Sequence, residues 1–419
     1  MKKILLPLLL LSVSSNLFAF ELTAVRASAL PAVELPQVPL PERLPEARPA
    51  AAKFAVYKVN GIPVAVPSIG CGYSLLAAVQ PRATSMAEEA LRSAFGAPAA
   101  KLVPLTPKSP AEVEFAAQNP GITVYALDQF LPANAAKLFN REPNFGGPNC
   151  FNAVFTAAGL MRPDQLRHVG NDEADQLLAM YYKKVPSTDL RPGDVLVIND
   201  GDHGVYYLGG GLVFHKKSYL KNHIYRITRL EKVYEAEPYE WTPSPFDGGS
   251  YQTGGTISRK DAWRPTGAQY QFGSATADEQ AKVNAIIFLE ENVVAQAPRW
   301  ALGKNLGYFT ERLLENLVSD WSALEKSPNP VLKAYYYKLA SLRDQANQSI
   351  EVELLSSQHA QANANEVLKS VWFPRNDYSR GLTQQLLAIY GRPASDADAA
   401  MAAIEKDYDG TPLTHIKGK

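Results

Sequence analysis

A cysteine at the start of an apolar helix constrains the fold of this chain more than any other feature. Residues 146–149 read Gly-Gly-Pro-Asn, which interrupts regular structure and supplies an asparagine suited to cap a helix. Apolar residues then recur at positions 151, 154, 155 and 158, the spacing of a helix face that packs on a core. We therefore expect a helix that begins at Cys150 and is closed by Gly159.

The position of Cys150 also predicts its chemistry. Unpaired backbone N–H groups at the start of a helix favour a thiolate, so we expect the pKa of Cys150 to lie a unit or more below its usual value of about 8.5. The same N–H groups can bind an oxyanion that develops during acyl transfer. Asn149 and Asn152 are the candidate supporting residues of this oxyanion site.

Two histidines lie on the arms of one predicted β-hairpin. An apolar strand at 195–198 is followed by the segments 203–208 and 212–215, which flank a glycine triplet at 209–211. A loop with an odd number of residues places His203 and His215 on one face, whereas an even loop places them on opposite faces. We predict a three-residue loop, and therefore a shared face for the two imidazoles.

These segments together resemble the NlpC-type family of papain-like cysteine peptidases, which trim bacterial cell-wall peptides. The resemblance spans about residues 120–235 and rests on the order of four motifs. They are Asn-Cys at 149–150, Leu-Arg-Pro-Gly-Asp-Val at 190–195, His-Gly-Val-Tyr-Tyr-Leu-Gly at 203–209 and Val-Phe-His at 213–215.

The resemblance implies an α+β fold with a papain-like (NlpC-type) core, in which an antiparallel β-sheet accompanies the cysteine helix. It implies that Cys150 is the nucleophile and His203 the base, and that His215 orients His203. We expect neither a cofactor nor a metal at this site.

Other interpretations of the same residues stay open. The chain has two cysteines, so Cys71 and Cys150 could form a disulfide, a common arrangement in exported proteins. Cys150, His203, His215 and His223 have the chemistry of zinc ligands, although no closely spaced pair anchors such a site. Taken singly, His203 could be a strand-edge residue and His215 a solvated hairpin residue. The remaining histidines are expected on the surface: His168, His359 and His415.

The N-terminal segment predicts export. A basic start at residues 1–3 is followed by an apolar stretch at 4–13 and the small-residue ending Leu-Phe-Ala, which together predict a signal peptide at residues 1–19. The frequent prolines of residues 20–52 predict an extended linker. We expect the mature protein in a bacterial periplasm or at the cell surface, without a transmembrane anchor.

The rest of the chain divides by composition into four parts. We expect a small mixed α/β accessory unit at 53–118, the cysteine hydrolase core at 119–240, a loop-rich connector at 241–274 and a helical domain at 275–410. The predicted helices of the last part are 277–294, 306–324, 330–355 and 378–390.

The balance of positive and negative charges limits the classes of partner that the sequence predicts. Lys plus Arg and Asp plus Glu both number 42, so no strong field favours nucleic acid or an anionic membrane. We expect an exported cysteine hydrolase that cleaves an amide bond, in peptidoglycan stem peptides or another peptide substrate. The alternatives are a non-catalytic binding or structural module of the envelope on the same fold, and a cysteine amidase or acyltransferase that acts elsewhere. The sequence leaves the partner of the helical domain unidentified.

Overall fold

The structure is a computed structural model of the 419-residue chain. It describes residues 54–59, 62–67, 76–79, 123–143, 146–220, 223–234, 241–243, 250–252, 256–273, 275–296, 321–356 and 377–407, with isolated positions between 88 and 117. The predicted signal peptide, the proline-rich linker and most of the predicted helix 306–324 lie outside the described residues, as do Cys71, His359 and His415.

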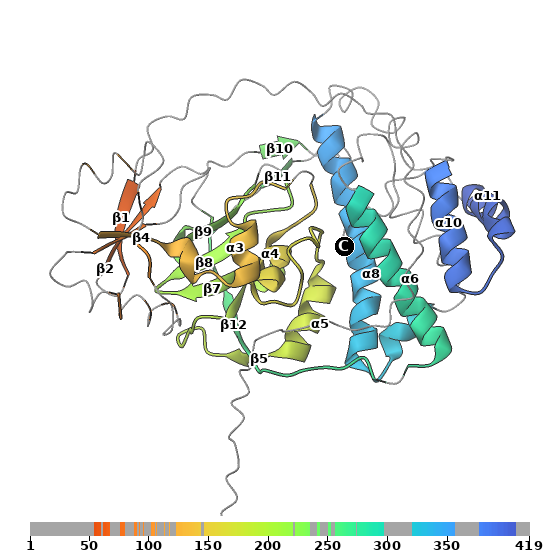
Figure 1. The fold of residues 1–419 in the computed structure, drawn as a ribbon, viewed down its shortest axis with the longest axis horizontal. Coiled ribbons are helices and arrows are strands. Elements are labelled where there is room, and N and C mark those ends of the chain that lie inside the picture. The colour runs from red at the N-terminus through yellow and green to blue at the C-terminus, as the bar shows by residue number, and fades with distance from the viewer. Residues whose placement is uncertain are drawn as a thin grey trace, which may run out of the picture. The chain divides into compact units, whose positions relative to one another are not determined.

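A six-stranded antiparallel sheet forms the centre of the fold, in the order β5-β12-β6-β7-β8-β9 (Figure 1). The strands are β5 (Tyr182–Val185), β6 (Val195–Ile198), β7 (His203–Gly209), β8 (Leu212–Lys216), β9 (Tyr225–Arg229) and β12 (Lys260–Pro265). All four residues of β6 are buried, as expected for a strand covered on both faces.

The segment 241–274 differs from the predicted connector. It holds the short antiparallel pair β10 (Trp241–Pro243) and β11 (Ser250–Gln252), and then β12, which enters the central sheet between β5 and β6. The many prolines, glycines and aromatic residues of this segment concealed a strand whose pairing partners lie more than 60 residues away. The sheet is therefore completed by residues beyond the predicted core boundary at 240.

The β7–β8 hairpin places His203 and His215 on one face, as predicted, but its loop differs from the prediction. Gly209 pairs with Leu212, so the tip holds two residues, Gly210 and Gly211, at φ of 58° and 81°. Positive φ at both tip residues is typical of a tight hairpin turn. The register shifts between Tyr207 and Gly209, which adds one residue to β7 as a bulge. This bulge gives the register of an odd loop, so the prediction of a three-residue loop was wrong but its consequence for the two histidines holds.

One face of the sheet is covered by α4 (Cys150–Ala157), whose eight residues are all buried. Ala153 and Ala157 of this helix share a hydrophobic cluster with Leu208 and Phe214 of the hairpin. The preceding α3 (Ala133–Leu138) contacts α4, and α5 (Asn171–Tyr181) leads directly into β5. This combination of helices with an antiparallel sheet confirms the expected α+β class.

The N-terminal part contains a second sheet of four antiparallel strands. They are β1 (Phe54–Val59), β2 (Ile62–Pro67), β3 (Leu76–Val79) and β4 (Thr123–Ala126), paired in chain order. The sheet of the expected accessory unit therefore extends past residue 118, because β4 pairs with β3.

The C-terminal part is helical. Its long helices α6 (Ala277–Gln296), α8 (Pro330–Ser356) and α10 (Asp377–Ile389) begin and end within a few residues of the predicted bounds, and α11 (Ala397–Asp407) follows. Helix α8 packs against both α6 and α5, which joins the helical part to the core (Figure 1). Among the helices that the structure describes, none is both long and apolar enough to cross a membrane.

Candidate functional site

Cys150 is the first residue of α4, as the sequence predicted. The Asn149 side chain caps the helix by accepting a hydrogen bond from the Asn152 backbone N–H at 3.2 Å. Gly147, two residues before the cap, has a φ of 128°, a conformation that favours glycine. Cys150 is a free thiol and its residue is only 6% exposed. Cys71, its partner in the disulfide alternative, lies outside the described residues.

The predicted lowering of the Cys150 pKa was wrong. Burial raises the pKa of Cys150 to about 11, and the backbone N–H groups of Gly204, Phe151 and Cys150 itself lower it by less. The positive charge of Lys216 also lowers it, by the smallest amount. A helix N-terminus favours a thiolate, but covering the sulfur with protein removes more solvation than these amides replace.

The two histidines lie together, in direct contact. His203 Nε2 and His215 Nδ1 are 2.9 Å apart, and the rings meet edge to face. The residues are 2% and 0% exposed, so the interpretations of a strand-edge His203 and a solvated His215 are wrong. Arg226, which pairs with His215 across the β8–β9 ladder, donates from Nε to His215 Nε2 at 3.2 Å.

The thiol and the histidine pair reach the same end of the sheet from opposite faces. A Cβ atom on Gly204 would lie 2.7 Å from the Phe151 ring, so Gly204 faces α4. Side chains alternate along a strand, which places the preceding His203 on the other face, where its ring lies 5.8 Å from that of Tyr234. Cys150 lies at this end too, because its sulfur is beside the Gly204 N–H and its charge influences Tyr234.

Both histidines are neutral over the physiological pH range. Burial lowers the pKa of His203 to about 3, with a further contribution from the Arg226 charge. The pKa of His215 is also lowered well below its usual value, first by burial and then by Arg226. The resting site therefore holds a thiol and two uncharged imidazoles.

Lys216 is a neighbour of the thiol that the sequence did not identify. It ends β8, is fully buried, and donates from Nζ to the backbone oxygens of Ser218 and Leu220. Burial lowers the pKa of Lys216 to about 7, and the charges of Cys150 and Glu142 raise it by less. A lysine beside hairpin residues reads as solvent-exposed in a sequence, and only the packed loop after β8 reveals its burial.

The predicted oxyanion-supporting residues serve the turn instead. Asn149 Oδ1 accepts from the Val169 and Asn152 N–H groups, and its Nδ2 donates to the Val169 oxygen at 2.8 Å. Asn152 donates from Nδ2 to the Gln165 oxygen and accepts at Oδ1 from the Tyr225 hydroxyl, both at 2.8 Å. These bonds hold the start of α4 in place.

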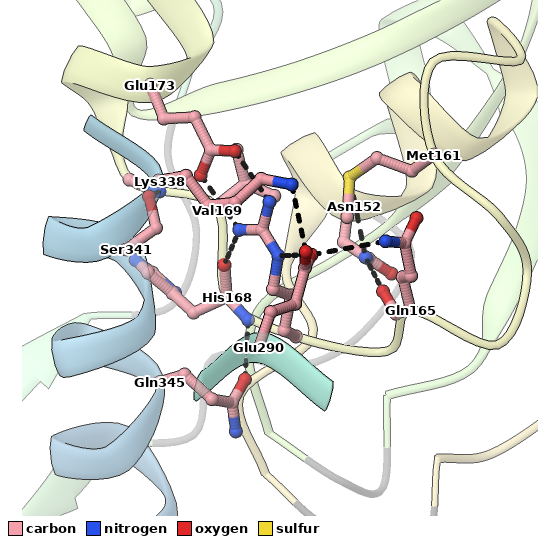
Figure 2. Close-up of polar contacts among 12 residues, drawn as sticks. Asn152, Met161, Gln165, His168, Val169, Glu173, Glu290, Lys338, Ser341 and Gln345 are labelled. Carbon is pink, nitrogen blue, oxygen red and sulfur yellow. Dashed lines mark hydrogen bonds and ion pairs between the residues drawn. The ribbon is translucent and has the colours of Figure 1, made fainter. Parts of the chain in front are cut away.

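Helix α8 is bonded directly to the turn that precedes Cys150, and also to the backbone at residue 168 (Figure 2). Gln345 donates from Nε2 to the Gly146 oxygen at 3.0 Å and accepts at Oε1 from the His168 N–H. Ser341, one helical turn earlier, accepts from the Gly170 N–H at 2.9 Å. The helical part therefore supports both chain segments that contact Asn149, the turn before it and residues 168–170.

A buried cluster of four charges lies beside these bonds (Figure 2). Arg167 pairs with Glu173 through two bonds of 2.6 and 2.8 Å, and with Glu290 of α6 at 2.8 Å. Lys338 of α8 pairs with the second Glu290 oxygen at 2.9 Å. The sequence did not predict this cluster, because Arg167 and its partner Glu290 are 123 positions apart in the chain.

The other histidines also differ from expectation. His168, expected on the surface, is partly buried, and burial together with the Arg167 charge lowers its pKa to about 4. His223 is buried and its Nδ1 lies 2.7 Å from the Ser218 hydroxyl. In the part of the chain that the structure describes, no three His, Cys, Asp or Glu side chains are grouped so that they could hold a metal ion.

The arrangement combines a thiol, a hydrogen-bonded histidine pair and backbone amides, groups of the kind that take part in acyl transfer. Comparison with protein-family models, with curated proteins and with solved structures finds no match to this chain.

Proposed function

We propose that this protein is an exported cysteine hydrolase with a papain-like (NlpC-type) core, which cleaves an amide bond in peptidoglycan stem peptides. One observation carries the proposal. Cys150 at the N-terminus of α4 and the bonded pair of His203 and His215 lie at the same end of the central sheet. The order and spacing of these residues along the chain supply the likeness to cell-wall peptidases.

The reaction follows the chemistry of the groups. His203 takes the Cys150 proton, and the sulfur attacks the amide carbonyl carbon to form a C–S bond. Backbone N–H groups at the start of α4 stabilise the oxyanion. His203 returns the proton to the leaving amine as the C–N bond breaks. Water then hydrolyses the thioester, which releases a carboxylate and restores the thiol.

Lys216 supports the charged stage of this cycle. Its ammonium is held by two backbone oxygens and interacts with the Cys150 thiolate. When Lys216 is protonated, its positive charge near the sulfur stabilises the thiolate while it forms. In other catalytic triads a carboxylate bonds the catalytic histidine and stabilises its charged form. In this chain the neutral His215 bonds His203 instead.

Digestion of purified wall peptides tests the proposal. The mature protein is incubated with peptidoglycan fragments, and mass spectrometry follows new amine and carboxylate ends. We expect cleavage by the wild type and by Cys71→Ser, and a loss of at least about a thousandfold in Cys150→Ala. Unchanged cleavage by Cys150→Ala would overturn the thiol mechanism. Cleavage of unrelated amides but not of wall peptides would instead favour the amidase or acyltransferase alternative.

A specific observation favours the second candidate, a non-catalytic envelope module. The buried Cys150 thiol has a raised pKa, and buried unreactive cysteines commonly serve as small apolar residues. This candidate predicts binding of wall fragments without any new chain ends. It also predicts equal binding by wild type and Cys150→Ala.

A further inference from the structure

We propose that Arg226 fixes the tautomers of His215 and His203, and thereby holds the histidine pair in a form that cannot accept the Cys150 proton. The inference rests on the proposed function, because it concerns the regulation of the same site. It makes Arg226 a positioning residue, one that acts through the histidines and not on the substrate.

The first step concerns His215. An arginine side chain has donors and no acceptor, so the contact from Arg226 Nε to His215 Nε2 requires a lone pair on that nitrogen. A neutral imidazole carries one ring proton. The proton of His215 must therefore be on Nδ1.

The second step passes this constraint to His203. His215 Nδ1–H points at His203 Nε2 over 2.9 Å, so His203 Nε2 is the acceptor of that bond. The ring proton of His203 is then on Nδ1. Because Nε2 is occupied by His215, Nδ1 is the one ring nitrogen left to exchange a proton with Cys150. A nitrogen that already carries a proton has no lone pair to receive another.

The third step shows what the base form of His203 requires. A free Nδ1 places the proton on Nε2, which then donates to His215 Nδ1. His215 must in turn carry its proton on Nε2, where it would face the Arg226 Nε–H donor at 3.2 Å. Two donors cannot bond each other, so the base form requires Arg226 to leave His215.

The charge of Arg226 acts in the same direction as its hydrogen bond. It lowers the pKa of both histidines, after the larger effect of burial. The other titratable groups around the pair are Lys217 after β8, His223 before β9 and Tyr234 after β9, together with Asp202 and Cys150, whose charges act on Tyr234. None of the groups that act on His215 is an acid that would favour an imidazolium.

Nuclear magnetic resonance of the ¹⁵N-labelled histidines tests the Arg226 lock, the fixing of both histidine tautomers by Arg226, in the wild-type protein itself. Long-range ¹H–¹⁵N correlations report which ring nitrogen carries the proton. We expect Nδ1 to be protonated in both His203 and His215 at neutral pH. Protonation of His203 at Nε2 would overturn the inference, and this measurement needs no variant to fold.

The variant Arg226→Met tests the consequence. We expect the Nε2-protonated form of both histidines to appear, and alkylation of Cys150 at pH 8 to become faster by about tenfold or more. Arg229→Met is the matched control, because it removes the same charge from the same strand at a residue that pairs with Glu231. Equal rates of Cys150 alkylation in wild type and Arg226→Met would contradict the Arg226 lock.

The two proposals fail in distinguishable ways. Wall peptides that stay intact, together with the expected histidine tautomers, would remove the proposed function and leave the Arg226 lock in place. Cleavage that depends on Cys150, together with an Nε2-protonated His203 in the wild type, would remove the lock and leave the hydrolase.

Discussion

Replacing Glu290 by glutamine tests the buried charge cluster that joins the helical part to the core. Glu290 is 4% exposed, and its two oxygens bind Arg167 and Lys338. Burial alone would raise the pKa of Glu290, but the charges of Lys338 and Arg167 and their hydrogen bonds outweigh it and lower the pKa to about 2. The glutamine keeps the shape of the side chain and removes its charge.

The magnitude follows from the pKa. A carboxyl group whose pKa is lower in the folded chain adds stability that is present above its unfolded pKa and is lost as the pH falls through the folded one. The lowering from 4.5 to about 2 corresponds to about 3 kcal/mol of unfolding free energy. We expect this amount to disappear between about pH 5 and pH 2. At pH 7, Glu290→Gln leaves two buried cations with one carboxylate, at a cost of about 3–5 kcal/mol.

Urea unfolding followed by circular dichroism at pH 7, 5, 4 and 3 measures both effects. The gap in unfolding free energy between wild type and Glu290→Gln should be largest at pH 7 and should narrow as the pH falls. Asp164→Asn is the control, because Asp164 and its partner Arg162 are 72% and 62% exposed, and such pairs contribute less than about 1 kcal/mol. A gap that stays constant from pH 7 to pH 3 would refute the reasoning, since Glu290 would then carry no differential charge.

Three further outcomes are expected. In Gly147→Ala the new Cβ would lie 2.0–2.3 Å from the Gln345 amide, so we expect the unfolding free energy measured in urea to fall by about 2–4 kcal/mol. The control is Gly159→Ala, for which we expect a loss of about 1 kcal/mol, because φ is also positive there but the space is open. In Gly204→Ala the Cβ would meet the buried Phe151 ring at 2.7 Å, so we expect the unfolding free energy to fall by about 1–3 kcal/mol and the alkylation rate of Cys150 to change. Unchanged stability would mean that α4 moves freely on β7. Alkylation of wild-type Cys150 should have its midpoint near pH 11, and a midpoint below about 8.5 would show that the thiol is activated at rest.

The local features of the site could be predicted from the sequence because their causes are local. The break before Asn149 and the apolar spacing after it predict where α4 begins, and the cap forms as expected. The shared face of His203 and His215 follows from the parity of the loop, and the bulge in β7 preserves that parity although the loop itself differs. The same kind of pattern predicts α6, α8 and α10 to within a few residues.

The remaining features depend on what covers each residue, which no local pattern contains. The direction of the Cys150 pKa shift is set by burial from distant segments, whereas only the helix terminus was visible in the sequence. Gln345 reaches Gly146 across 199 positions, and β12 enters the sheet between strands that precede it by more than 60 residues. These contacts make the helical part a support of the cysteine turn, a role that its composition does not reveal.

The two pKa values of the proposed pair show why the resting site is neutral. Moving the proton from Cys150, with a pKa of about 11, to His203, with a pKa of about 3, costs about 11 kcal/mol when each group is taken alone. Even if the two charges were in contact, about 4 Å apart, their attraction would return about 4 kcal/mol at an effective dielectric constant of about 20. The remaining cost, about 7 kcal/mol, would hold the ion pair near one molecule in 10⁵. The proposed thiol mechanism therefore requires an event that raises the His203 pKa. Withdrawal of the Arg226 charge and hydrogen bond is the change that acts on the tautomer and the charge together.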